Sequence, residues 1–209
     1  MKIDARTLPR VTRDPGAWRV ILLHGEDTGL IRERAQDAVK QIAGSVDDPF
    51  RVAVLDKETH DRLEEEATAF SLMGGRRAVR VRDAGDGLLK AITHVLEQNT
   101  DTLVVLEAPG LPSRSKLRAL LEKRPDCASV GCYPEEGRTL EATITQMLAS
   151  HSVRIDQDAL HWLTGRLGAD RGAARREVEK LALYAGDTGT LSLDDVHVCI
   201  GDAGSVSVE

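Results

Sequence analysis

The chain has 209 residues, of which 41% are hydrophobic and 30% are charged, and its formal net charge is -6. This composition is ordinary for one or two folded domains, and the negative balance excludes an overall basic footprint for nucleic acid while leaving room for local basic patches. Aromatic residues make up only 3% of the chain, so we expect a core built from aliphatic side chains.

Targeting signals are lacking in the sequence. No apolar run approaches the ~20 residues of a membrane span, and the N-terminal stretch lacks the apolar middle of a signal peptide. We therefore expect a cytoplasmic protein that makes no membrane contact. The cysteines, Cys127, Cys132 and Cys199, form no CxxC pair, which argues against a disulfide framework and against a metal site.

The first two-thirds of the chain alternates strand and helix signals. Five strands are predicted, at 18–24, 50–56, 76–83, 102–108 and 127–133. Helices are predicted between them, at 27–44, 58–70, 86–99 and 113–124. Strands separated by helices pair through parallel crossovers, so the pattern predicts an α/β fold with a five-stranded parallel sheet flanked by helices.

The pattern changes after the "PEEG" segment at 134–137, where strand signals largely stop. Helices are predicted from there on, at about 138–151, 156–167, 171–185 and 193–200. We therefore predict an α/β domain over 1–137 and a small all-helical domain over 138–209.

The first strand runs into a glycine turn and then a helix, as in a phosphate-binding loop. A working loop reads G-x-x-x-x-G-K-[S/T], and its lysine is missing here. The acids that follow the first glycine would also repel a phosphate at a helix start. We interpret the segment as a degenerate loop that binds no nucleotide, formed by Gly25, Glu26, Asp27, Gly29, Leu30 and Ile31, the last two standing where a second glycine and the lysine belong. A diverged phosphate-loop ATPase remains the alternative.

Other enzyme signals are weak. The fourth strand ends in Glu107, a single carboxylate followed by Ala108, which we interpret as a solvated strand end. The arginine and valine alternation of "RRAVRVRD" indicates that one face of the third strand is wet. The histidines are scattered, with no pair at metal-ligand spacing. We expect no catalytic residues, no bound metal and no cofactor.

A candidate protein-binding element lies in "AFSLMGGRR", residues 69–77. Leu72 and Met73 are adjacent apolar residues, and two glycines directly after them allow a sharp turn. Adjacent apolar side chains at the tip of a loop are typical of an anchor for a protein partner. The alternative is a helix end at which Phe70 faces the core.

These motifs together resemble the delta subunit of the bacterial DNA polymerase III clamp loader. That family has a strand followed by G-[D/E]-[D/E]-x-x-L-[I/L]-x-E, and this chain matches it from Gly25 to Glu33. An S-L-[F/M]-like motif precedes the third strand of the family, matched here by Ser71 to Met73. Two further matches are "SKLRALLEK" at 115–123 and "EVEKLALYAG" at 177–186.

The resemblance implies an AAA+-like α/β domain that has lost its nucleotide site, followed by a helical lid domain. It implies a non-catalytic subunit of the DNA-directed DNA polymerase holoenzyme, which binds the sliding clamp (beta) and opens its ring for loading onto primed DNA during replication. The clamp-binding residues it implies are Phe70, Ser71, Leu72 and Met73.

The family normally carries a third, C-terminal collar domain through which the loader subunits join, and we expect it to be absent from this chain, which ends at "GDAGSVSVE". Through that collar the family associates with the delta prime and tau/gamma subunits, and it meets DNA through the assembled complex. A direct DNA-binding module is a further alternative. It would use arginines in two groups, Arg76, Arg77, Arg80 and Arg82, and Arg166, Arg171, Arg175 and Arg176.

Overall fold

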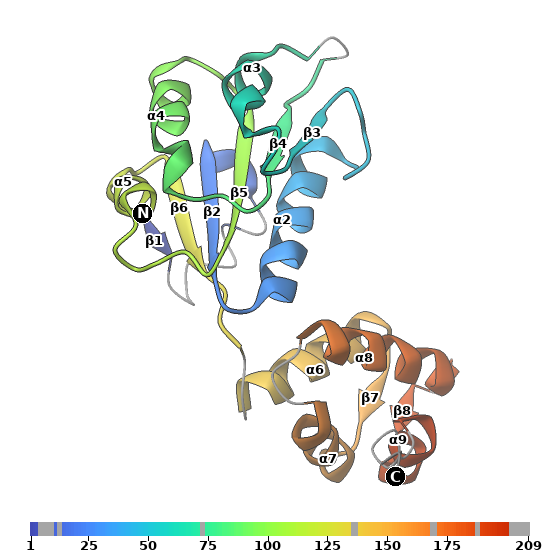
Figure 1. Cartoon of the computed structure of the whole chain (residues 1–209). Coiled ribbons are helices and arrows are strands. Elements are labelled where there is room, and N and C mark those ends of the chain that lie inside the picture. Colours follow the sequence, from blue (N-terminus) through green and yellow to red (C-terminus); the bar gives the residue numbers. More distant parts are fainter. Residues whose placement is uncertain are drawn as a thin grey trace, which may run out of the picture. The chain divides into compact units, whose positions relative to one another are not determined.

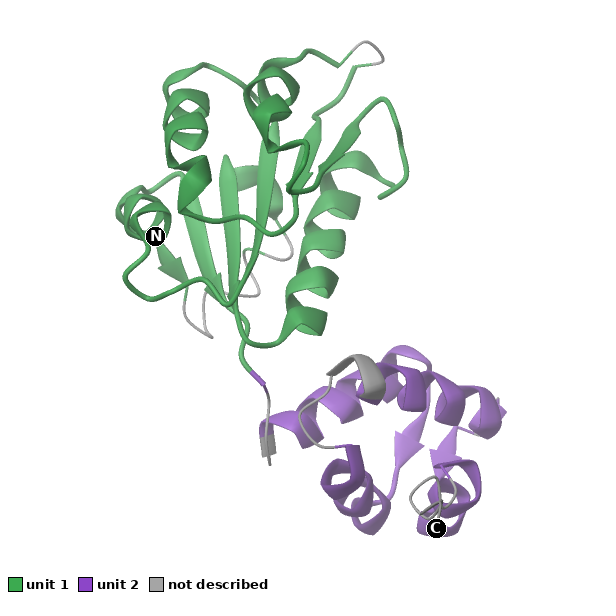
Figure 2. Ribbon diagram, viewed as in Figure 1, with its two compact units in different colours: residues 1–133 green, residues 134–209 purple. Residues whose placement is uncertain are grey.

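The computed structural model describes residues 1–3, 11, 14–71, 74–134, 138–167, 171–186 and 189–200. The chain divides into two compact units, residues 1–133 and 134–209 (Figures 1 and 2). The sequence pattern places the change of architecture a few residues later, at 137. Within the described ranges, every helix is too short or too polar to cross a membrane.

The first unit is built on a parallel sheet with the strand order β1-β6-β2-β5-β4-β3. Its strands are β1 (Lys2–Ile3), β2 (Val20–Gly25), β3 (Val52–Leu55), β4 (Ala78–Val81), β5 (Leu103–Pro109) and β6 (Cys127–Gly131). The five predicted strands are present, but the sheet has six. The sequence does not reveal β1, because a two-residue strand is too short to show a periodic pattern.

Helices cover both faces of this sheet (Figure 1). One face packs on α2 (Thr28–Ala43), and the other packs on α3 (Leu63–Thr68), α4 (Leu89–Glu97) and α5 (Lys116–Lys123). Short 3-10 turns lie at Pro15–Ala17, His60–Arg62 and Asp86–Leu88. The strand β2 is buried along its whole length, with Ile21 and Leu23 in the core under α2 and Val20 and Leu22 in the opposite core.

The strand order reverses beside β2. That strand pairs with β5 on one side and with β6 on the other, and the chain then leaves through α2 to the far edge at β3. In an open α/β sheet, the crevice at such a reversal is where ligands usually bind. The fold therefore directs attention to Gly25 and the first turn of α2.

The second unit consists mainly of helices, which are α6 (Arg138–Ser150), α7 (Gln157–Leu167), α8 (Arg171–Ala185) and α9 (Leu193–Ile200). It also contains a parallel pair of two-residue strands, β7 (Arg154–Ile155) and β8 (Thr190–Leu191), so the expectation of an all-helical unit is corrected in this detail. Its core is aliphatic, as the composition predicts, and includes Ile144, Leu148, Leu163 and Leu181.

Candidate functional site

The turn between β2 and α2 is fixed by the backbone of the neighbouring strand. Gly25 has φ +138°, and a Cβ placed on it would lie 2.0 Å from the carbonyl oxygen of Cys132. The Cys132 amide donates to the carbonyl of His24 at 2.7 Å, and the Asp27 amide donates back to the carbonyl of Cys132 at 3.1 Å. Glycine is needed here for close approach of two backbones.

The start of α2 is capped by its own side chain. Asp27 accepts a hydrogen bond from the Leu30 amide at 2.8 Å and is itself buried. Ile31, which occupies the position of the lysine in a phosphate-binding loop, is 2% exposed and packs in the core under α2. The Asp27 carboxylate therefore supplies the hydrogen-bond acceptor that the N-terminus of α2 needs. Ile31, at the position of the lysine, faces the core.

The neighbouring strand ends carry a buried ion pair. Arg80 on β4 donates through Nε to Oε1 of Glu107 on β5. Arg80 is 5% exposed and Glu107 is 7% exposed, so the interpretation of Glu107 as a solvated strand end is wrong. The predicted wet face of the third strand is also wrong, since all four residues of β4 are buried. The charges neutralise each other beneath the first turn of α2.

The candidate protein-binding element lies in the connection from α3 to β4. Leu72 and Met73 lie outside the described residues, whereas the residues on either side of them are described. Phe70 is 93% exposed, so the alternative in which it faces the core is wrong. Ser71 Oγ donates to the carbonyl of Gly74 at 2.8 Å. Gly74 and Gly75 have φ of +74° and +79°, values that favour glycine.

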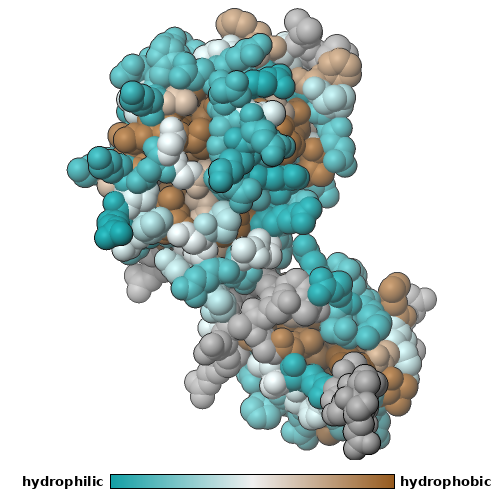
Figure 3. Space-filling model, viewed as in Figure 1, coloured by the Kyte–Doolittle hydropathy of each residue, from teal (hydrophilic) through white to brown (hydrophobic). Residues whose placement is uncertain are grey.

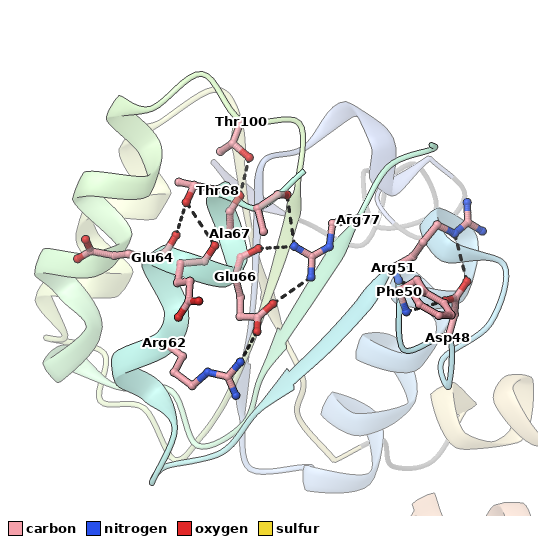
Figure 4. Close-up of polar contacts among 12 residues, drawn as sticks. Asp48, Phe50, Arg51, Arg62, Glu64, Glu66, Ala67, Thr68, Arg77 and Thr100 are labelled. Atoms are coloured by element: carbon pink, nitrogen blue, oxygen red, sulfur yellow. Dashed lines mark hydrogen bonds and ion pairs between the residues drawn. The ribbon is translucent and has the colours of Figure 1, made fainter. Parts of the chain in front are cut away.

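The base of this loop is held by Arg77, which directly precedes β4 (Figure 4). Its guanidinium donates to the carbonyls of Glu66 at 3.1 Å and Ala69 at 3.3 Å. These carbonyls lie at the end of α3, where a helix leaves its last acceptors without a partner of its own. It also pairs with the Glu66 carboxylate at 2.9 Å, and Arg62 contacts the other oxygen of that carboxylate at 2.6 Å. A cation at a helix C-terminus also interacts favourably with the helix dipole.

A second contact ties α3 to the loop before β5, where Thr100 Oγ1 donates to the carbonyl of Ala67 at 2.6 Å (Figure 4). A depression of about 520 Å³ lies along this junction, lined by residues 68–71, 75–77 and 98–102. The base of the loop is therefore anchored on two sides.

The loop before β3 adjoins the same edge of the sheet. The carbonyl of Arg51 accepts from the Ala78 amide at 2.8 Å, and Arg51 Nη1 lies 2.7 Å from where a Cβ on Gly75 would stand. Next to it in sequence, Phe50 is 62% exposed (Figure 4). Figure 3 shows a mostly hydrophilic surface over the viewed face of the first unit, with hydrophobic residues visible in gaps. Both phenylalanines of the chain are thus exposed, in loops before neighbouring strands.

Three of the arginines proposed for direct DNA binding, Arg76, Arg77 and Arg80, contact other groups of the first unit, whereas Arg82 and Arg166 are exposed. Arg76 donates to the carbonyls of Gly16 at 2.6 Å and Trp18 at 2.7 Å. Arg77 and Arg80 make the contacts described above, and Arg166 lies over the Trp162 ring with its Cζ 5.9 Å from the ring centroid. The side chain of Arg171 lies outside the described part of the chain. These contacts weaken the case for a free basic patch.

His24 and Cys127, the side chains that could act as a base or a nucleophile, have pKa values shifted by burial. Burial lowers the pKa of His24 to about 4, with the Arg118 guanidinium acting in the same direction. Burial raises the pKa of the Cys127 thiol to about 12, which makes it a poor nucleophile. Across the described ranges, no three His, Cys, Asp or Glu residues come together in a group that could hold a metal ion.

Comparison with known proteins points to one family. Residues 22–130 match the family model described as DNA polymerase III, delta subunit. A probable DNA polymerase III subunit delta from Rickettsia prowazekii is 24% identical over 181 residues, which is 87% of this chain and 55% of that protein. The DNA polymerase III subunit delta of Bacillus subtilis is 25% identical over 202 residues, covering 87% of this chain and 56% of that protein.

Solved structures show the same fold. The Bacillus subtilis DNA clamp loader delta protein superposes with a TM-score of 0.70 at 20% identity, covering 94% of this chain and 62% of that one. Domain III of the Thermotoga maritima replication initiation protein DnaA gives a TM-score of 0.54 at 14% identity, with coverage of 94% and 89%. The chain thus spans a little over half the length of the curated relatives that it matches.

Proposed function

Since the chain belongs to the family of DNA polymerase III delta subunits, we propose that it serves as the delta subunit of a bacterial clamp loader. In this role it binds the sliding clamp (beta) and opens one interface of the ring, so that the clamp is loaded onto primed DNA. The ATP hydrolysis of the loader falls to partner subunits.

The observation that carries this proposal is the exposure of Phe70. Phe70 is 93% exposed and is followed within three residues by the apolar Leu72 and Met73, a sequence typical of a contact with a protein partner. The base of the loop is held by Arg77 and Glu66, which supports a pre-organised anchor. We assign clamp contact to residues 70–73.

A non-catalytic role is supported by the start of α2. Asp27 fills the place of an anion at the helix N-terminus, and Ile31 packs in the core where a phosphate-binding lysine would stand. We therefore propose that the chain binds no ATP and hydrolyses none. Magnesium-dependent ATP binding in calorimetry would instead favour a diverged ATPase.

Ring opening follows from differential binding. A loop that fits the open interface of the clamp better than the closed one shifts the population toward the open ring, and it does so by no more than the difference in affinity. The same proposal assigns contact with the delta prime and tau/gamma subunits to the family's collar domain, and contact with DNA to the assembled complex.

The test is a pull-down of a purified bacterial sliding clamp, with calorimetry for the affinity. Full burial of one large apolar side chain contributes roughly 1.5–3 kcal/mol. The variant Leu72→Ala/Met73→Ala should therefore lose about 3–6 kcal/mol of binding, which is roughly two to four decades of affinity. The melting temperature should change little.

Two outcomes would count against the assignment. A double variant that melts far below the parent chain would mean that the two side chains belong to the core. A double variant that melts normally and binds the clamp with unchanged affinity would move the contact elsewhere on the α/β unit. Failure of the parent chain to bind any bacterial clamp would refute the proposed function itself.

A further inference from the structure

A cleft of about 380 Å³ lies where β4 and β5 end against the first turn of α2. Thr28 and Gly29 border it from the helix, and Arg80 and Glu107 border it from the strands. Arg32 and Arg82, both exposed, also line it. The cleft lies at the reversal of strand order, which is the usual place for a ligand in such a sheet.

Arg80 is not fully satisfied in this cleft. Its Nε donates to Glu107, but the buried Nη2 group has no hydrogen-bond partner among the described residues. A buried donor without an acceptor is unfavourable, and native proteins seldom leave one unless a further group completes it. Because Arg80 lines the cleft, a ligand with acceptor oxygens could supply the missing partner after a small side-chain adjustment.

The charges around the cleft favour an anion. Three arginines line it, at 32, 80 and 82, against two carboxylates, Asp83 and Glu107. The first turn of α2 borders the cleft through Thr28 and Gly29, and its N-terminus is already capped by Asp27. Asp27, which caps that helix, is not among the lining residues. Among the lining residues the arginines exceed the carboxylates by one, and guanidinium groups match the oxygens of a phosphate in geometry as well as in charge.

We propose that this cleft binds a single phosphate group, held by Arg80 at its floor and by Arg32 and Arg82 at its rim. The ligand class is a small tetrahedral oxyanion rather than a nucleoside triphosphate, since Ile31 leaves no lysine to hold a phosphate chain. The site is formed by the strand ends and the start of α2, and it does not depend on clamp binding by residues 70–73.

The test is an NMR titration of the whole chain with inorganic phosphate at constant ionic strength, with chloride as the matched salt. We expect saturable shifts at the Thr28 and Gly29 amides and at the Arg80 side chain. Removing two charge-assisted contacts with Arg32→Ala/Arg82→Ala should weaken phosphate binding by at least about tenfold. The control Arg114→Ala removes an exposed arginine that does not line the cleft and should change nothing.

Shifts reproduced by chloride, or weakened equally by Arg114→Ala, would indicate an adventitious ion only and would overturn the proposal. Absence of saturable shifts in the parent chain would do the same. A further titration uses ATP with magnesium, for which we expect binding no tighter than that of phosphate. ATP bound more than about tenfold tighter would identify a nucleotide site, whereas clamp pull-down separately decides the proposed function.

Discussion

Arg77 holds the base of the exposed loop, and Arg77→Met removes its guanidinium while keeping much of its length. The change breaks contacts to the carbonyls of Glu66 and Ala69 and to the Glu66 carboxylate, at 3.1, 3.3 and 2.9 Å. Hydrogen bonds to a charged group contribute about 1.5–3 kcal/mol each, but these three share one guanidinium and are not additive. Glu66 also keeps Arg62 as a partner. We therefore expect a loss of about 2–4 kcal/mol from the free energy of unfolding.

The assay is unfolding by urea and by heat, followed by circular dichroism. For a chain of this size, 1 kcal/mol shifts the melting temperature by about 2–4 °C, so Arg77→Met should lower it by roughly 5–15 °C. The matched control is Arg62→Met, which removes an arginine from the same carboxylate. Its side chain is 53% exposed and makes a single ion pair within one helical stretch, so the expected loss is below about 1 kcal/mol.

Equal unfolding midpoints for Arg77→Met and Arg62→Met would refute this reasoning. They would mean that the carbonyls at the end of α3 are satisfied by water once the guanidinium is gone, and that the loop needs no buried anchor. Arg77→Met should also weaken clamp binding, because the loop then loses part of its fixed orientation.

Three further predictions rest on single positions. Phe70→Ala should leave the free energy of unfolding unchanged, because the side chain is exposed, but should weaken clamp binding by about 1.5–3 kcal/mol in calorimetry. The control is Leu183→Ala, which removes an 84% exposed side chain in the second unit and should leave clamp binding unaffected. Gly25→Ala should cost more than about 4 kcal/mol or prevent folding, since it places a Cβ against the neighbouring backbone, whereas Gly87→Ala has open space and should unfold like the parent chain. The pKa of His24 is lowered from 6.5 to about 4 in the folded state, so the unfolded chain binds a proton more readily. The free energy of unfolding should therefore fall as the pH drops from about 6.5 to about 4. The His24→Gln variant should lack this pH dependence in denaturation experiments, and an identical dependence would exclude His24 as its cause.

Apolar runs separated by helical segments were sufficient to predict the five main strands of the sheet and their parallel pairing. The strands that escaped prediction are β1, β7 and β8, each two residues long. Such strands exist only because a partner strand is already in place, so their cause is tertiary and leaves no local period in the sequence.

Side chains of the candidate site were predicted unevenly, for a related reason. The missing lysine of the turn could be read from a fixed spacing, whereas the capping role of Asp27 and the burial of Ile31 emerge only from the structure. The pairing of Arg80 with Glu107 depends on β4 and β5 being neighbours, which links residues far apart in sequence. An alternating arginine in a strand looks the same whether it meets water or a buried carboxylate, so the sequence favoured the wrong environment.

The position of β2 has a consequence for how the chain folds as it is synthesised. This strand is made early, yet its two neighbours, β5 and β6, follow only after Leu103 and Cys127. Until β5 has left the ribosome, β2 has neither of its neighbouring strands, and until β6 has followed, one edge of β2 exposes its backbone. Non-local parallel pairing of this kind folds slowly and leaves edges open to aggregation. We therefore expect nascent chains that stop before β6 to be held by chaperones, and native structure to form only once the sheet can close around β2.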